Sequence, residues 1–129
     1  MFFEDNYMEI IMDALLIKGS KEIENYFGYF PSFHDDYIER IEITSQAITI
    51  GIRMESLESN QKLNTKERVK LTFTEVKSFS FAGELYGCVS IILDMIFEKQ
   101  EQGIVTKIET SLGTEGVICA KEIAIELLS

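Results

Sequence analysis

The spacing of the apolar residues changes at Pro31, and this change constrains the fold more than any other feature of the sequence. Before Pro31, apolar residues recur at intervals of three and four, which is typical of an amphipathic helix with one buried stripe. After Pro31 they alternate with polar residues, which is the pattern of a strand with one buried face. The sequence therefore predicts helices at the N-terminus and strands in the rest of the chain.

Two helices are predicted in the first part. The first covers residues 6–18 and ends at Gly19, because glycine is a poor helix former. The second begins at Ser20, whose hydroxyl can cap the first turn, and it ends at Gly28.

A hairpin, a loop and a long strand are predicted next. The hairpin turns near Ser45 and Gln46, and the polar residues 55–68 after it are typical of a mobile loop. The chain from Arg68 to Phe81 forms one long bent strand, or two strands joined at 75–77. The residues expected to face the core from these strands are Ile41, Ile43, Ile48, Ile50, Ile52, Met54, Val69, Leu71, Phe73, Phe79 and Phe81.

The C-terminal third contains one ambiguous segment and a second hairpin. Residues 85–100 fit a helix face and a strand face, and we favour a short helical turn followed by a strand. Alternation resumes over 104–127, with a turn at 113–116.

These elements predict a single α+β domain over residues 1–129, in which two N-terminal helices pack on a twisted antiparallel sheet of about five or six strands. The solvent-facing side of this sheet is either an ordinary solvated face or a surface that binds a partner. Its outward residues include Arg40, Glu42, Thr44, Lys107, Glu109, Glu122 and Glu126.

The net charge narrows the class of partner. The chain has 12 basic and 22 acidic residues, a net charge of −10, which argues against binding nucleic acid or an anionic membrane. Residues 1–64 carry −7 and residues 65–129 carry −3, so the N-terminal half is the more acidic. A basic protein partner, or no partner, fits this charge better.

The sequence also suggests a compartment. The N-terminus is acidic from Glu4 and has no secretory signal, and apolar runs are too short to cross a membrane. We therefore expect a cytoplasmic protein in which Cys88 and Cys119 are reduced, buried thiols.

Residues for catalysis are scarce. His34 is the single histidine, Gly-rich phosphate loops are missing, and metal sites usually need several closely spaced ligands. We therefore expect no enzyme activity, no cofactor and no metal. Two alternatives stay open: a small ligand-binding or hydrolase domain with a pocket near His34 and Asp35, under the 55–68 loop, or a module that self-associates through an edge strand.

The residues around His34 are interpreted as structural. An imidazole beside Asp35 can hold the corner between helix and sheet by hydrogen bonds to the backbone. The structural residues of this motif are Gly28, Pro31, Phe33 and His34.

The stretch from Tyr26 to Ile38, which reads YFGYFPSFHDDYI, resembles the motif of the immunity protein 50 family of bacterial polymorphic toxin systems. In that family a Phe-Gly pair ends a short helix, and a Pro-Ser-Phe-His-Asp block leads into an alternating strand. The chain departs from the family pattern at Asp36, where a small residue is commoner, and in having no tryptophan. The resemblance implies a cytoplasmic antitoxin that binds and blocks a co-encoded toxin domain without chemistry of its own.

The leading hypothesis is therefore an immunity protein that binds its toxin through an acidic, partly aromatic surface. A toxin that cleaves nucleic acid, such as a basic nuclease, would suit this charge. The candidate toxin-binding residues are Asp35, Asp36, Tyr37, Glu39 and Glu42.

Overall fold

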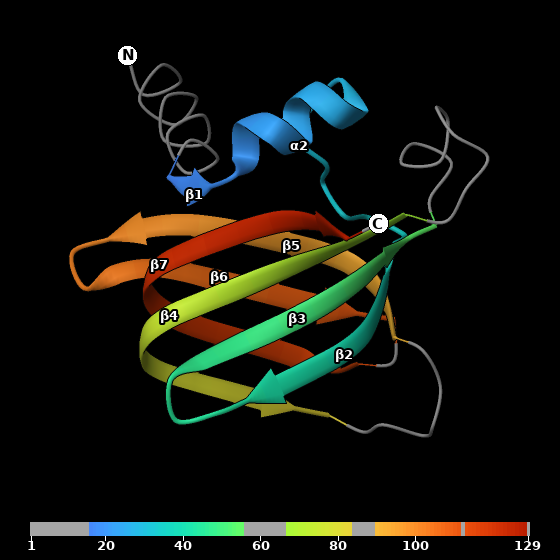
Figure 1. Ribbon diagram of the computed structural model, residues 1–129. Helices are drawn as coiled ribbons and strands as arrows, with labels where there is room; N and C mark the ends of the chain where they lie inside the picture. The colour runs from blue at the N-terminus through green and yellow to red at the C-terminus, as the bar shows by residue number, and fades with distance from the viewer. Residues whose placement is uncertain (1–15, 56–66, 84–89, 112, 129) are drawn as a thin grey trace, which may run out of the picture.

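The computed structural model describes residues 16–55, 67–83, 90–111 and 113–128, and this part of the chain is mostly strand (Figure 1). Its elements in chain order are β1 (Ile17–Lys18), α2 (Ser20–Phe27), β2 (Tyr37–Ile43), β3 (Ala47–Met54), β4 (Glu67–Ala82), β5 (Ser90–Gln100), β6 (Gly103–Thr110) and β7 (Glu115–Leu128).

The strands form one sheet that curls into a nearly closed ring (Figure 1). Their order is β1-β7-β4-β3-β2-β5-β6, and β6 pairs again with β7. The short β1 is parallel to β7, whereas the other neighbours are antiparallel. In the described part of the chain, β2 and β5 are joined by two pairs, Tyr37 with Ile91 and Ile38 with Ser90.

The hydrophobic core fills the inside of this ring. Alternate residues of each strand point inward, so Ile50 of β3 lies beside Leu71 of β4, which lies beside Ile125 of β7. The largest fully buried side chains are Phe33, Phe73, Ile17, Ile23, Ile48, Ile50, Ile52, Met54, Leu71, Ile92, Ile118 and Ile123.

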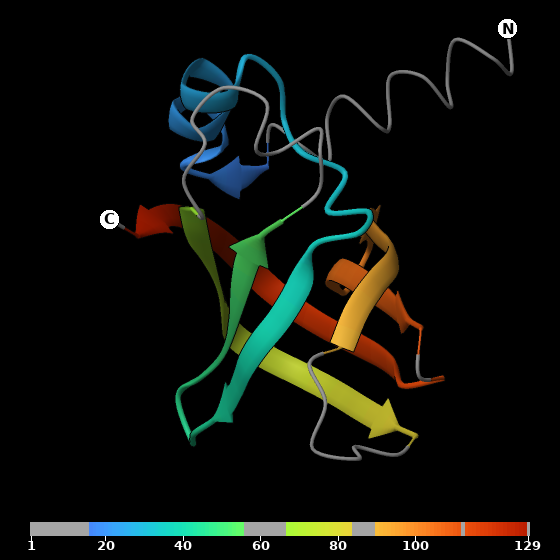
Figure 2. The same ribbon diagram turned by 90° about the vertical axis from the view of Figure 1, so that its right-hand side faces the viewer.

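Helix α2 lies above one end of the ring in both views (Figures 1 and 2). Ile23 and Phe27, four residues apart, are buried on its inner side and join the core. Gly19 precedes the helix at φ 87°, and a Cβ there would collide with the carbonyl oxygen of Ile125. Glycine is therefore needed where the chain turns from β1 into the helix.

The predicted architecture of two helices packed on a sheet is wrong. The described residues contain one short helix and a seven-stranded mixed sheet in a nearly closed ring. The first predicted helix, residues 6–18, lies mostly outside the described residues, and its last two residues, Ile17 and Lys18, form β1. Pairing of Ile17 with Ile123 in β7 overrides the helical spacing at this point.

Most of the strand predictions are confirmed. The first hairpin is β2 and β3 with its turn at Ser45 and Gln46, and the last hairpin is β6 and β7. β4 is one long strand, whose irregularity falls between Val76 and Ser78, beside a positive φ at Glu75. β5 confirms a strand over 90–100, whereas the expected helical turn before it and most of the 55–68 loop lie outside the described residues.

Three residues expected in the core are exposed instead. Ile41, Ile43 and Phe79 are 38%, 50% and 48% exposed. Ile41 and Ile43 share the inner face of β2, but they lie beyond its last pair with β5, where the described strands leave the ring open. Alternation identifies the inner face correctly but does not show where the ring ends.

Among the described residues, no helix has both the length and the apolar character needed to cross a membrane.

Candidate functional site

The residues of the motif lie in the segment that joins α2 to β2, and they hold this segment against β5. The backbone N–H of Asp35 donates to the carbonyl of Ile92 at 2.8 Å, and the N–H of Ile92 donates to the carbonyl of Asp36 at 2.8 Å. Nδ1 of His34 lies 2.7 Å from the carbonyl oxygen of Leu93. Because a carbonyl only accepts, this nitrogen carries the hydrogen. The block thus continues the contact with β5 where the β2–β5 pairing stops.

The other motif residues shape this connection. Phe33 is 1% exposed and meets the ring of Phe30 edge-on, with 6.0 Å between the ring centroids. Pro31 is buried, and Gly28 ends α2 at φ 90°, where its N–H donates to the carbonyl of Glu24. These contacts support the structural role expected of Gly28, Pro31, Phe33 and His34, which stays a prediction.

Asp36 does not lie on the surface, and this corrects its expected place among the toxin contacts. Its exposure is 0%, and Oδ1 accepts a hydrogen bond from the backbone N–H of Glu55 at 2.9 Å. A buried carboxylate needs such partners, because its desolvation is costly without them. Asp36 therefore joins the start of β2 to the end of β3 and is not available to a partner.

The neighbouring acidic candidates are engaged by arginines. Glu39 accepts from Nε of Arg68 at 2.7 Å and lies 3.5 Å from Nη1 of Arg53. The hydrogen bond from Arg68 lowers the pKa of Glu39 below its usual value. The guanidinium of Arg53 also stacks over the ring of Tyr37, 4.9 Å from its centroid.

The remaining two candidates differ from each other. Glu42 forms an ion pair with Arg40, whereas Asp35 is a well-exposed carboxylate whose Oδ1 lies 3.6 Å from Nε2 of His34. The five predicted contacts are close together in the sequence, but in the structure they do not form a free acidic surface.

The Glu39 pair gives a prediction about pH. The pKa of Glu39 is lower in the folded protein than in the unfolded chain. The ionised carboxylate therefore adds to the free energy of unfolding at a pH above its unfolded pKa, and this stabilisation is lost as the pH falls through its folded pKa. We expect Glu39→Gln to lower the free energy of unfolding by about 0.5–1 kcal/mol at pH 7. The difference from wild type should vanish as the pH falls from about 5 to about 2. Urea unfolding at several pH values measures it.

The matched control for this experiment is Glu122→Gln, which removes a single, well-exposed ion pair with Lys18. Exposed pairs contribute little, so the control should change stability less than Glu39→Gln at pH 7. An effect of Glu39→Gln that stays the same at low pH would contradict the assignment.

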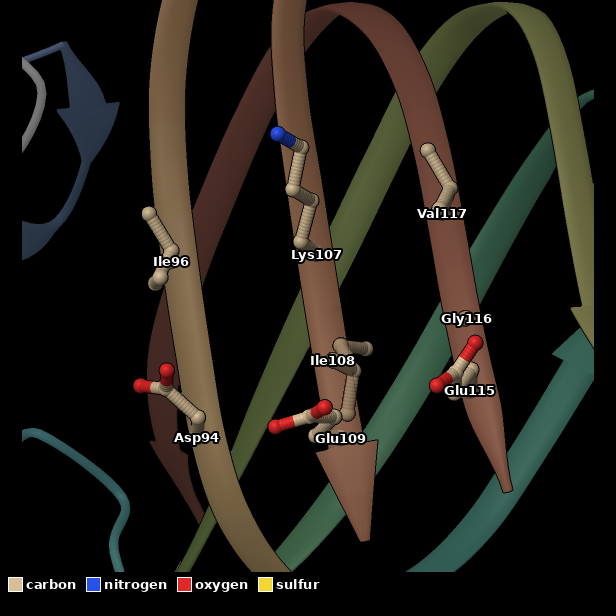
Figure 3. Close-up of a pocket in the computed structure, with 8 residues that line it drawn as sticks. All are labelled: Asp94, Ile96, Lys107, Ile108, Glu109, Glu115, Gly116 and Val117. Atoms are coloured by element: carbon tan, nitrogen blue, oxygen red, sulfur yellow. The ribbon is translucent and has the colours of Figure 1, made fainter. Parts of the chain in front are cut away.

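A different acidic surface lies on the outside of β5, β6 and β7 (Figure 3). Asp94 pairs in register with Glu109, and Glu109 pairs in register with Glu115. The three carboxylates thus form a row across three strands, on the side turned away from the core. Within the described residues, none of the three forms an ion pair. We call them the acidic row.

Exposed apolar side chains lie beside the acidic row. Ile96 and Val117 are 42% and 40% exposed and flank Lys107 on the next row of the sheet. The Lys107 ammonium lies 3.5 Å from Glu98 and points away from the acidic row (Figure 3). A hollow of about 330 Å³ runs between these residues, lined by Asp94, Ile96, Lys107, Ile108, Glu109, Glu115, Gly116 and Val117.

Facing like charges should make the acidic row locally unfavourable. Like charges directly opposite on neighbouring strands destabilise a sheet by a few tenths of a kcal/mol. We therefore expect Glu109→Gln, in the middle of the row, to raise the urea midpoint at low salt, and the gain to shrink at high salt. The control is Glu126→Gln, which loses an ion pair with Lys70 and should gain nothing. A lower midpoint for Glu109→Gln would show that the row stabilises the fold.

The alternative of a pocket near His34 and Asp35, under the 55–68 loop, stays a prediction, because most of that loop lies outside the described residues. Among the described residues, no three His, Cys, Asp or Glu side chains lie close enough together to hold a metal ion. His34 is bonded to the backbone of β5. Cys119 is a free, half-buried thiol, not a buried one, and Cys88 lies outside the described residues.

Sequence reasoning identified Glu109 as an outward residue but missed the acidic row. Asp94 lies in β5, one strand before Glu109, and Glu115 lies in β7, after the turn that follows Glu109. Only the register of three strands brings the carboxylates together.

Comparison with known proteins adds no relative to this picture: no family model matches the chain, and no curated protein matches it.

Proposed function

We propose that the protein binds a toxin protein and neutralises it by contact, without catalysis. The observation that carries the proposal is the outer face of β5–β7, where three carboxylates lack ion-pair partners among the described residues beside half-exposed Ile96 and Val117. Such a surface has the mixed apolar and charged character of a protein interface. The net charge of −10 and the motif from Tyr26 to Ile38, which resembles the immunity protein 50 family, support a basic toxin as the partner.

The filled interior favours a binding protein over a ligand-binding or hydrolase domain. Rings of strands that hold a small molecule enclose it between inward-facing side chains. Here inward side chains such as Phe73, Ile50 and Ile118 are 0% exposed and pack against each other. Recognition is therefore expected on the outside of the ring.

The proposal extends to the compartment. An antitoxin must meet its toxin inside the cell that produces both, so we expect a cytoplasmic protein.

Co-expression tests the function. The toxin-like domain encoded beside the gene of this protein would be produced in a sensitive host, with and without the protein, and survival would be counted. We expect survival only with the protein, and a stoichiometric complex in size-exclusion chromatography. An unrelated acidic protein of similar size and net charge is the control, because charge alone can bind basic proteins weakly. Equal killing in the presence of the folded protein would refute the proposal.

A further inference from the structure

We infer that the outer face of β5–β7 is the docking surface, and that its occupant is a basic segment of the toxin. In this arrangement an arginine or lysine of the segment faces the acidic row, and an apolar side chain beside it packs between Ile96 and Val117. The inference rests on the proposed function, because it assigns a place to the toxin.

The first argument is the contrast in ion pairing around the ring. On the neighbouring strands several carboxylates have a cation close by: Glu122 has Lys18 at 3.2 Å, Glu126 has Lys70 at 2.9 Å, and Glu39 has Arg68 at 2.7 Å. The acidic row has three carboxylates in register and no such cation among the described residues. A cation supplied by a partner would relieve the repulsion within the row and gain the attraction of three carboxylates together.

The second argument is the position of Lys107. It is the cation on β6 next to the acidic row, and it extends toward Glu98 instead of toward Glu109 (Figure 3). The row is therefore left open to a cation from outside, while the stem of Lys107 adds apolar surface between Ile96 and Val117.

The third argument is the shape of the surface. The hollow of about 330 Å³ lies at the low end of the range for small-molecule pockets, and it is open along the sheet. Half-exposed Ile96 and Val117 on its two sides are suited to contact with a side chain. An apolar centre with charges at its margin is the usual anatomy of a protein interface.

Charge reversal tests the inference. The variant Glu109→Lys/Glu115→Lys would be compared with Glu24→Lys/Glu101→Lys, which makes the same change in net charge on α2 and on the β5–β6 turn. Affinity for the toxin domain would be measured by calorimetry at low and moderate salt. We expect the first variant to bind at least about 30-fold more weakly, because it places like charges together in the interface. The control should lose about twofold to threefold, through weaker long-range attraction only.

A second variant tests the apolar part without a change in charge. Val117→Ser keeps a small side chain on the exposed face of β7 and should weaken binding by about three- to tenfold, with little dependence on salt. Circular dichroism and urea unfolding confirm that each variant is folded before its affinity is compared.

The possible results separate this inference from the proposed function. A complex with the wild-type protein that tolerates both Glu109→Lys/Glu115→Lys and Val117→Ser would keep the function and overturn this docking surface. An equal loss for the charge-reversal variant and its control would also overturn it, because net charge alone would explain binding. No complex with the wild-type protein would overturn the function and the docking surface together.

Discussion

Replacing Phe33 by alanine is expected to lower the free energy of unfolding by about 3–5 kcal/mol, the largest single effect we predict. The side chain is 1% exposed and packs edge-on against Phe30, so its removal leaves a cavity beneath the chain that joins α2 to β2. Small domains are stable by only about 5–15 kcal/mol, so the loss is a large fraction of the total stability. Urea unfolding at 25 °C, followed by circular dichroism, measures the loss.

Phe33→Leu is the matched control for this prediction. It keeps most of the apolar volume and the same backbone, whose φ of 64° is unusual for any side chain. We expect a loss of about 1–2 kcal/mol, clearly smaller than that of the alanine variant. If Phe33→Ala unfolded like wild type but no longer bound the toxin, the motif would be a contact surface and not a structural corner.

Alternation in the sequence was sufficient to locate most strands and their inner faces. Ile48, Ile50, Ile52 and Met54 are at most 1% exposed, as the period of two predicts. The same period placed Ile43 and Phe79 in the core, and both are about half exposed. Local alternation says which face of a strand is apolar, whereas burial also needs a neighbouring strand, and the neighbours are set by long-range pairing.

The overall architecture was not predictable for a related reason. A sheet that stays open and one that curls until β6 meets β7 have the same alternation, since closure depends on twist and register. The length of β4 was a hint: its 16 residues pair with β7 along most of the strand and with β3 along the first half. The helical spacing of apolar residues before Gly19 predicted a helix over residues 6–18, whereas Ile17 pairs with β7 in the sheet.

The candidate site shows the limits of charge counting. Five residues near His34 were chosen because acidic residues are dense there, but the fold brings Arg53 and Arg68 to Glu39 from other strands. The three carboxylates of the acidic row, which have no such cation among the described residues, lie in the less acidic half of the chain. Net charge suggested the class of partner, whereas the location of the surface required the register of the strands.

The second large effect is expected at Asp36, where alanine should lower the free energy of unfolding by about 1–3 kcal/mol. The substitution removes the acceptor of the Glu55 backbone N–H, and the buried donor loses its 2.9 Å hydrogen bond. It also weakens the link between the start of β2 and the end of β3, close to the two residue pairs that join β2 to β5 among the described residues. Urea unfolding compares the variant with wild type.

Asp36→Asn separates the hydrogen bond from the charge. An asparagine keeps an oxygen that can accept from the N–H of Glu55, so we expect it to restore most of the stability lost in Asp36→Ala. Because Asp36 is 0% exposed, Asp36→Asn should also leave affinity for the toxin unchanged at 25 °C, where the variant is folded. A folded Asp36→Asn protein with a large loss of affinity would return this carboxylate to the binding surface, and the docking face would then have to extend from β5 to the start of β2.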